Sequence, residues 1–473
     1  MEKNTSSLPK TSGLASAWRR LRRKIDSQSV INDWPYICIP SNNIKALPGP
    51  TAFRENLLQL IDNAQRRILL ATLYLQDDDG GQEILLALHD AKKRRPELEI
   101  SVFVDWHRAQ RGLIGKAKSP GNVALYQKVA KELGLGVQIY GIPVQRREFF
   151  GVMHLKGFVI DDDVLYSGAS LNDVYLQYFP RYRIDRYHLI HSAVLANIMV
   201  ELMTNTLQHH LAVNRLDTDK IPKTVTIRRQ IAHLRQELTK ARYTLPEKLT
   251  QRPLNSDEVG VLPLIGLGVR ENAVNRAILD LIREAKKHVV LFTPYFNLPG
   301  PIYRMIDAAL KKGCKVTIIT ADKTANDFYI SPEETFQTIG ALPYLYEVNL
   351  RRFCKKYHKA IGSNLLNIHL WQHHDNTFHL KGLLVDDDYT LLTGHNFNPR
   401  AWRLDLENSL LIRDPHKLLL NQNHAELESI LVHSRRLMHY SELEDIKDYP
   451  QPVRRLMRRL TRVRADRLIN QVL

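Results

Sequence analysis

One pattern that could carry chemistry occurs twice in the chain. Residues 154–161 read HLKGFVID and residues 379–386 read HLKGLLVD, so each copy is an H-x-K-x4-D pattern. A single H-x-K is common by chance, but two copies with the same spacing and the same following turn argue for a functional site. The residues concerned are His154, Lys156, Asp161, His379, Lys381 and Asp386.

Each copy is predicted to lie in a strand, which decides which side chains share a face. Residues i and i+2 of a strand point the same way, so each histidine and its lysine face the same space. The aspartates come seven positions after the histidines, on the other face or at the strand end, where an orienting or structural role is expected. A glycine-containing loop then follows and ends in Asn172 or Asn398.

Two such sets facing each other would suit a phosphodiester substrate. One imidazole would attack phosphorus and form a phosphohistidine, while the other would protonate the leaving oxygen and then deprotonate the incoming nucleophile. Lys156, Lys381, Asn172 and Asn398 would hold the phosphate oxygens and stabilise the developing charge. Because the lysines supply positive charge, we expect no metal ion and no other cofactor.

The elements that must position these residues alternate between strand and helix. Helices predicted at 53–65 and 83–95 alternate with apolar strands, and helices predicted at 273–285 and 302–313 do the same. Such alternation implies parallel pairing in an α/β sheet, and two copies imply a duplicated domain. In each copy, a strand ending in three aspartates and a second strand predict a hairpin with an acidic turn.

Composition shifts divide the chain further. A leader that we expect to be weakly structured precedes the first copy, and a charged segment with a polar helix over 228–245 separates the copies. The predicted organisation is a basic leader (1–48), repeat 1 (49–221), a helical linker (222–260), repeat 2 (261–445) and a basic amphipathic tail (446–473).

The charge of the chain points to polyanionic partners. Its 473 residues contain 67 Lys plus Arg against 50 Asp plus Glu, a formal net charge of +17. Nucleic acid and an anionic membrane surface both fit such a charge. No stretch of about 18 apolar residues occurs, so we expect neither a membrane span nor a secretory signal. Three scattered cysteines fit a reducing cytosol.

The tail is predicted to be an amphipathic helix on a membrane surface. Its apolar stripe consists of Val453, Leu456, Met457, Leu460 and Val463. The membrane-binding candidates on the other side are Arg454, Arg455, Arg458, Arg459 and Arg462. Packing against another subunit and binding to a ribosome or nucleic acid remain open alternatives, as does assembly into a homo-oligomer.

The duplicated pattern resembles the phospholipase D superfamily, whose motif is a repeated H-x-K-x4-D followed by a G-S-x-x-N-like loop. The serine of that loop is replaced by Ala169 and His395. Glu407 matches the acidic residue that follows the motif, whereas Tyr187 stands at the corresponding point after the first copy. The resemblance implies two α/β/α sandwich repeats with the active site between them, and by analogy His154 as nucleophile and His379 as acid/base.

Longer segments resemble the phosphatidylserine synthases of Gram-negative bacteria from about residue 30 to the C-terminus. They include LYLQDDDGG, FVDWHRAQRG, TPYFNLPG, DKTANDFYI and NPRAWRLDLEN. This resemblance implies an enzyme that makes phosphatidylserine and CMP from CDP-diacylglycerol and L-serine through a phosphatidyl-enzyme, in the cytoplasm and at the inner membrane surface. A cardiolipin synthase, a phosphodiesterase or nuclease of the superfamily, and an inactive basic binding protein are the alternatives.

Two further groups of residues are candidate binding sites. Arg108 and Arg111 follow a predicted strand and could meet the diphosphate of a CDP-lipid. The cluster His373, His374 and Asp375 before His379 has poor ligand spacing on one element, so a solvated loop is the better interpretation.

Overall fold

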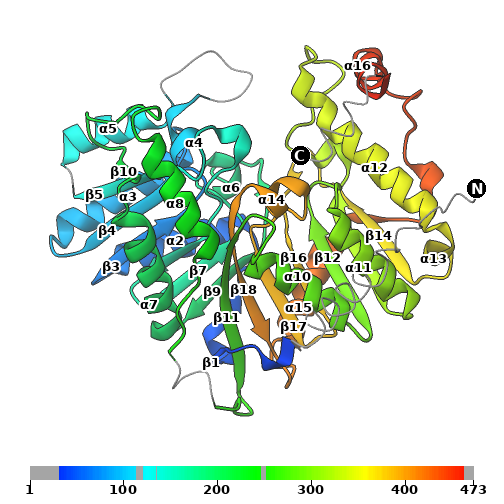
Figure 1. Cartoon of the computed structure of the whole chain (residues 1–473), viewed down its shortest axis with the longest axis horizontal. Helices are drawn as coiled ribbons and strands as arrows, with labels where there is room; N and C mark the ends of the chain where they lie inside the picture. The colour runs from blue at the N-terminus through cyan, green and yellow to red at the C-terminus, as the bar shows by residue number, and fades with distance from the viewer. Residues whose placement is uncertain (1–30, 113–120, 135, 247–251, 463–473) are drawn as a thin grey trace, which may run out of the picture.

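The computed structural model describes residues 31–112, 121–134, 136–246 and 252–462. Two α/β halves lie side by side, with repeat 1 in blue to green and repeat 2 in green to orange (Figure 1). Each half is built on its own sheet, and the predicted duplication is visible in the strand order.

The sheet of repeat 1 has eight strands in the order β10-β5-β4-β3-β6-β7-β9-β2. Strands β3, β4 and β5 are parallel, as the strand–helix–strand pattern predicts, and β6 pairs antiparallel with β3. The strands are β2 (Ile44–Ala46), β3 (Arg67–Ala71), β4 (Glu99–Asp105), β5 (Val137–Ile142), β6 (Gly157–Ile160), β7 (Asp163–Ser167), β9 (Tyr187–His191) and β10 (Asn214–Arg215).

The sheet of repeat 2 has nine strands, and its segment β14-β13-β12-β16-β17-β18 repeats the order and directions of β5-β4-β3-β6-β7-β9. The strands are β1 (Ile37–Pro40), β11 (Glu258–Leu267), β12 (His288–Thr293), β13 (Lys315–Ala321), β14 (Leu366–Trp371), β16 (Gly382–Val385), β17 (Tyr389–Thr393), β18 (Leu406–Arg413) and β19 (Ser434–Leu437). Both β6–β7 and β16–β17 are the predicted hairpins with acidic turns.

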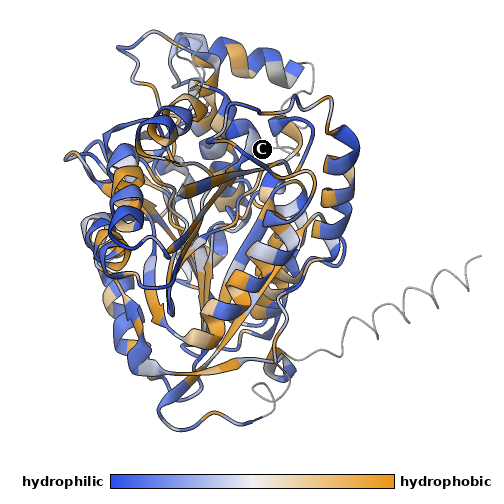
Figure 2. Cartoon of the chain, turned by 90° about the vertical axis from the view of Figure 1, so that its left-hand side faces the viewer, coloured by the Kyte–Doolittle hydropathy of each residue, from blue (hydrophilic) through white to orange (hydrophobic). Residues whose placement is uncertain are grey.

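Helices cover the sheets because each carries an apolar stripe. In α2, for example, Phe53, Leu57 and Ile61 recur at helical spacing and are buried. Figure 2 shows hydrophilic and hydrophobic residues along the same outer helices. The helices are α2 (Pro50–Asn63), α3 (Asp79–Arg94), α4 (Trp106–Gln110), α5 (Val123–Leu133), α6 (Asp173–Leu176), α7 (Ala193–Leu202), α8 (Arg228–Lys240), α10 (Ala273–Glu284), α11 (Gly300–Lys311), α12 (Leu342–Lys356), α13 (His358–Gly362), α14 (Pro399–Arg403), α15 (Leu420–Leu431) and α16 (Gln451–Arg462).

The two repeats share one core rather than standing as separate bodies. The apolar cluster that fills repeat 1 continues into β11 and β18 of repeat 2 through buried residues such as Val261, Leu406 and Leu410. A two-residue parallel ladder also joins β8 (Arg183–Ile184) of repeat 1 to β15 (Thr377–Phe378) of repeat 2. The relative placement of the halves is therefore fixed by packing and by backbone hydrogen bonds.

The leader and the linker differ from the prediction at their ends. Residues 31–48 are structured, because β1 pairs with β11 of repeat 2 and β2 pairs with β9 of repeat 1. The linker helix is present as α8, but its apolar residues pack into the shared core. Strand β11 already begins at Glu258, inside the predicted linker. Residues 1–30 lie outside the described part of the chain.

The tail forms a helix, α16, but its apolar stripe is not free. Val453 and Met457 are buried against Tyr344 and Leu345, which lie on α12. The arginine side faces outward, with Arg455, Arg458, Arg459 and Arg462 exposed and Arg454 half-buried. The prediction of a stripe that enters a bilayer is therefore wrong for Val453 and Met457. Residues 463–473 lie outside the described residues, and within those described no helix is long and apolar enough to cross a membrane.

Candidate active site

The two H-x-K segments lie just before β6 and β16, and each is held by the opposite repeat. The backbone N–H of His154 donates to the carbonyl of Leu406 at 2.9 Å, and that of His379 donates to the carbonyl of Ile184 at 2.9 Å. Each segment is therefore hydrogen-bonded to the backbone of the other half of the molecule. These hydrogen bonds between the repeats bring two histidines that are far apart in sequence to one interface.

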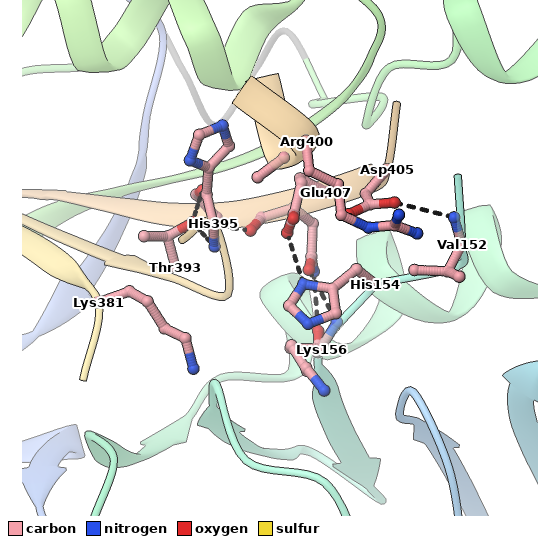
Figure 3. Close-up of polar contacts among 12 residues, drawn as sticks. Val152, His154, Lys156, Lys381, Thr393, His395, Arg400, Asp405 and Glu407 are labelled. Atoms are coloured by element: carbon pink, nitrogen blue, oxygen red, sulfur yellow. Dashed lines mark hydrogen bonds and ion pairs between the residues drawn. The ribbon is translucent and has the colours of Figure 1, made fainter. Parts of the chain in front are cut away.

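In the first half of the site, His154 is oriented by a carboxylate of repeat 2. Its Nδ1 lies 3.0 Å from Oε2 of Glu407, the contact drawn as a dashed line in Figure 3. The Lys156 ammonium donates to Oγ of Ser170 at 2.9 Å. The carboxamide of Asn408 bonds both the N–H and the C=O of Lys156 at 2.8 Å, which fixes the backbone at this point.

In the second half, His379 is oriented by a carboxylate of repeat 1. Its Nδ1 lies 3.1 Å from Oδ2 of Asp185, which also accepts a hydrogen bond from the Lys381 ammonium at 2.8 Å. The hydroxyl of Tyr175 lies 2.8 Å from the same ring nitrogen. Lys381 and Lys156 reach the site from the two different repeats (Figure 3).

Burial and like charges set the protonation of these groups. Burial, followed by the charge of the neighbouring lysine, lowers the pKa of His154 and that of His379 well below the usual range. Burial and the charge of Lys381 lower the pKa of Lys156 to about 7. Burial raises the pKa of Glu407 well above its usual range. Both imidazoles are therefore neutral in the free protein at neutral pH.

This arrangement leaves one nitrogen of each ring available for chemistry. Where the ionised form of Glu407 or Asp185 accepts the Nδ1 hydrogen, the tautomer has its lone pair on Nε2. The Nδ1 of His379 is also contacted by the Lys381 ammonium and the Tyr175 hydroxyl. A neutral, desolvated imidazole of this kind is a nucleophile or a base, and the two lysines can neutralise phosphate oxygens. The geometry suits two-step transfer of a phosphoryl group between the repeats.

Comparisons with known proteins agree with this geometry. The family model described as "Cardiolipin synthase, PLD-like domain" matches residues 57–173 and 278–431. The CDP-diacylglycerol–serine O-phosphatidyltransferase of Escherichia coli K12 is 49% identical over 440 residues, which covers 93% of this chain and 96% of that protein. The chain belongs to this phospholipase D-like family of phosphatidyltransferases.

Two further findings come from Haemophilus influenzae. A protein with the same enzyme name is 44% identical over 447 residues, covering 94% of this chain and 97% of that protein. The crystal structure of phosphatidylserine synthase from this organism superimposes with a TM-score of 0.91 at 43% identity, covering 96% of this chain and all of that one. The family fold thus extends over nearly the whole chain.

The structure does not bring Asp161 and Asp386 to the histidines. Asp161 lies beyond the far end of β6, where its carboxylate accepts the backbone N–H groups of residues 65, 66 and 67 at 2.8–3.1 Å. Asp386 accepts those of residues 286, 287 and 288 at 2.6–2.8 Å. Both carboxylates hold a turn, so the prediction that Asp161 and Asp386 belong to the catalytic residues is corrected.

Asn172 and Asn398 lie at the start of short helices next to the site. The Asn172 carboxamide oxygen accepts from the N–H of Tyr175 at 3.1 Å and caps α6, and that of Asn398 accepts from the N–H of Ala401 at 2.9 Å and caps α14. Asn172 thus begins the helix that delivers Tyr175 to His379.

The two predicted diphosphate-binding arginines differ in position. Arg108 lies over the ring of Tyr74 at 5.1 Å, and its charge contributes to the lowered pKa of Lys156. Arg111 is engaged by Glu148, with one hydrogen bond of 2.6 Å. The structure therefore places Arg108 near the reacting groups, and both arginines share Glu148, which lies 3.7 Å from the guanidinium of Arg108.

Several functional residues escaped the sequence analysis. The second orienting carboxylate is Asp185, two positions before the predicted Tyr187, whose ring instead packs 4.8 Å from that of Phe53 in the core. Ser170, one position after Ala169, accepts a hydrogen bond from the ammonium of Lys156. The RID of residues 183–185 matches the RLD of residues 403–405, but this match pairs Asp185 with Asp405 rather than with Glu407. The two orienting carboxylates stand at different offsets from their strands.

Metal-ligand spacing occurs elsewhere among the described residues. His210, His233 and Glu237 form one such group at the surface. Nδ1 of His210 accepts the N–H of Ala212 at 3.0 Å, so the ring hydrogen stays on Nε2, which lies 3.1 Å from Nδ1 of His233. The group is therefore bonded internally. His373 contacts the hydroxyl of Tyr182 at 2.6 Å and stacks on His433.

Proposed function

We propose that the chain transfers the phosphatidyl group of CDP-diacylglycerol to L-serine, giving phosphatidylserine and CMP. The observation that carries this proposal is the crossed site, in which each histidine is oriented by a carboxylate of the other repeat. The names of relatives that match nearly the whole chain supply the substrates.

The first step forms a phosphatidyl-histidine. Nε2 of His154 attacks the phosphorus that carries the diacylglycerol, the bond from this phosphorus to the bridging oxygen breaks, and CMP leaves. In the substrate complex the negative charge of the diphosphate favours protonation of His379 by a proton from solvent, and the protonated ring then delivers this proton to the leaving oxygen of CMP. Lys156 and Lys381 neutralise the phosphate oxygens. Glu407 stabilises the charge that develops on the His154 ring.

The second step transfers the lipid to serine. His379, now neutral, accepts the proton of the serine hydroxyl while the oxygen attacks phosphorus and the bond to His154 breaks. Both steps use the same two rings in exchanged roles, which is why two oriented imidazoles at one interface are needed.

The test is isotope exchange in the absence of serine. The protein should move labelled CMP into CDP-diacylglycerol dispersed in detergent. Adding serine should convert the labelled CDP-diacylglycerol to phosphatidylserine and release the label as CMP. Synthesis without any exchange would contradict a covalent intermediate and favour direct displacement. Activity unaffected by a chelator would support the expectation that the lysines replace a metal.

We also propose that the protein works at an anionic membrane surface. The exposed arginines of α16 support this, and so do Arg146, Arg147, Phe149 and Phe150, four exposed side chains in the segment leading to His154. Aromatic and basic side chains together suit the interface of a lipid bilayer. The apolar stripe of α16 packs inside the protein, so its arginines would act through charge.

Vesicle flotation tests the surface assignment without removing α16. Replacing Arg455, Arg458 and Arg459 by glutamine should weaken salt-sensitive binding to anionic vesicles but spare turnover in detergent. The matched control is replacement of Lys286 and Lys287, two exposed lysines in the turn before β12. Equal binding by the α16 variant and the control would contradict a role for α16.

A further inference from the structure

A buried ion pair lies beside His379 and has no part in the transfer steps described above. The guanidinium of Arg183 lies 3.4 Å from Oδ2 of Asp327, and the hydroxyl of Tyr295 donates to the other oxygen of Asp327 at 2.8 Å. Arg183 also lies over the ring of Tyr175 at 4.9 Å. The pair joins β8 of repeat 1 to the loop that follows β13 of repeat 2.

The pair is in electrostatic contact with His379. The rings of Tyr175 and Tyr295 lie 5.4 Å and 5.9 Å from the ring of His379, both edge-on, and each tyrosine contacts one member of the pair. Burial lowers the pKa of His379, the charge of Asp327 opposes this shift, and the charge of Arg183 adds to it. A small molecule bound to the pair would therefore lie next to the imidazole.

The pair also keeps capacity for a ligand. The side chains of Arg183 and Asp327 are 16% and 11% exposed, so neither is sealed in the core. Arg183 has five N–H donors, and its contacts with Thr377 and Asp327 engage only two of its three nitrogens. A buried ion pair by itself is weak evidence for stability, because desolvation offsets much of the attraction.

The two halves of the site differ in their arginines. On the His154 side, three arginines (Arg108, Arg111 and Arg400) contact Glu148 and Asp405, and Glu407 adds a third carboxylate. On the His379 side, one arginine, Arg183, faces Asp327. Several guanidinium groups suit a diphosphate, whereas a single pair of opposite charges suits a zwitterion.

We propose that Arg183 and Asp327 form the subsite for the amino acid acceptor. The α-carboxylate would bind the free donors of Arg183, and the α-ammonium would bind Asp327. In serine the carboxylate and the ammonium are both attached to the α-carbon and the hydroxyl is attached to the adjacent β-carbon, so the hydroxyl lies within about 4 Å of both charges. An acceptor held this way presents its hydroxyl to His379, the base of the second step.

The subsite rests on the proposed function, and its test separates the two transfer steps. Asp327→Asn keeps the shape of the side chain and removes its charge. We expect the KM for serine to rise at least about 10-fold, while serine-independent CMP exchange falls much less, by about 2- to 3-fold, because that step loses only the charge beside His379. Arg183→Gln should also raise the KM for serine, and Arg183→Lys should restore part of the loss.

Acceptor analogues sharpen the assignment. Serine methyl ester lacks the negative charge, so Arg183→Gln should lower turnover of serine strongly but leave the already weak use of the ester nearly unchanged. Asp327→Asn should impair both acceptors, because both carry the ammonium group. The opposite pattern would overturn the assignment of the two charges.

A matched control is available in repeat 2. Lys323 and Glu347 form an ion pair of 3.2 Å with side chains 14% and 10% exposed, nearly as buried as the proposed subsite. Glu347→Gln should change neither the KM for serine nor the exchange rate. If Asp327→Asn lowers exchange and serine transfer equally, the pair is structural and the proposal is wrong. If the unaltered protein shows exchange but no transfer to serine, the proposed function fails instead.

Discussion

The surroundings of His154 and His379 show how a duplicated domain acquires two different half-sites. Both histidines precede equivalent strands, β6 and β16, in sheets of the same order. Three arginines gather on the His154 side, whereas the single pair of Arg183 and Asp327 lies beside His379. The strands thus repeat the scaffold, and the loops at their ends decide which half can bind donor and which can bind acceptor.

The two orienting carboxylates differ in the same way. Glu407 is the second residue of β18, while Asp185 stands two residues before β9. Both nevertheless reach the Nδ1 of a histidine at 3.0–3.1 Å. The shorter aspartate compensates for its different backbone position, and it also bonds Lys381, whereas Lys156 uses Ser170 instead.

Removing either imidazole should have the largest effect. His154→Ala and His379→Ala should each lower the rate of phosphatidylserine synthesis at least about 10³-fold, because each loses covalent or acid–base catalysis. Labelled lipid should accumulate on the protein, in an acid-labile form, only where His154 is present. Covalent label retained by His154→Ala would reverse the assigned roles.

Removing the orienting carboxylates should have the next largest effect. Glu407→Gln and Asp185→Asn should each lower kcat about 10- to 100-fold, because the tautomer of the opposite histidine is no longer fixed. Glu407→Gln should slow exchange of CMP, whereas Asp185→Asn should slow both exchange and the serine step. If neither variant differs from the unaltered protein in rapid single-turnover measurements, the crossed pairing is not used in catalysis.

The lowered pKa of Lys156 predicts a pH effect of moderate size. Its folded pKa of about 7 lies below that of an ordinary lysine, so the charge is present at lower pH and is lost as the pH rises through about 7. kcat/KM for CDP-diacylglycerol should therefore fall on the alkaline side. Lys156→Arg should lower activity but move this fall to higher pH, and an unchanged profile would assign the limb to another group.

Asp161 and Asp386, the aspartates that hold the two turns, should affect stability more than activity. Asp161→Ala and Asp386→Ala each remove an acceptor of three backbone N–H groups, so each should lower the free energy of unfolding by about 2–4 kcal/mol. Urea unfolding measures this loss, with Asp162→Ala as a neighbouring control. Activity per folded molecule should stay within about 2-fold; a 10³-fold loss in a stably folded variant would restore these residues to the catalytic set.

The strands and hairpins were predictable because their signals are local. Alternation of apolar strands and amphipathic helices predicts β3, α3 and β4, and the repeated triple aspartate predicts both acidic turns. The role of residues 31–48 was not predictable, because two short strands of ordinary composition gain their partners only from β11 and β9. The apolar stripe of α16 likewise predicts burial but not whether lipid or α12 provides it.

The sequence by itself determined the chemistry, since two histidines and two lysines at one repeated spacing suit phosphoryl transfer whatever the fold. Only the tertiary structure decided which groups act on which ring. Glu407 is 253 residues from His154, and Asp185 is 194 residues from His379. Such contacts depend on how the two repeats pack against each other, because strand periodicity fixes the face of a side chain but not the element that lies opposite.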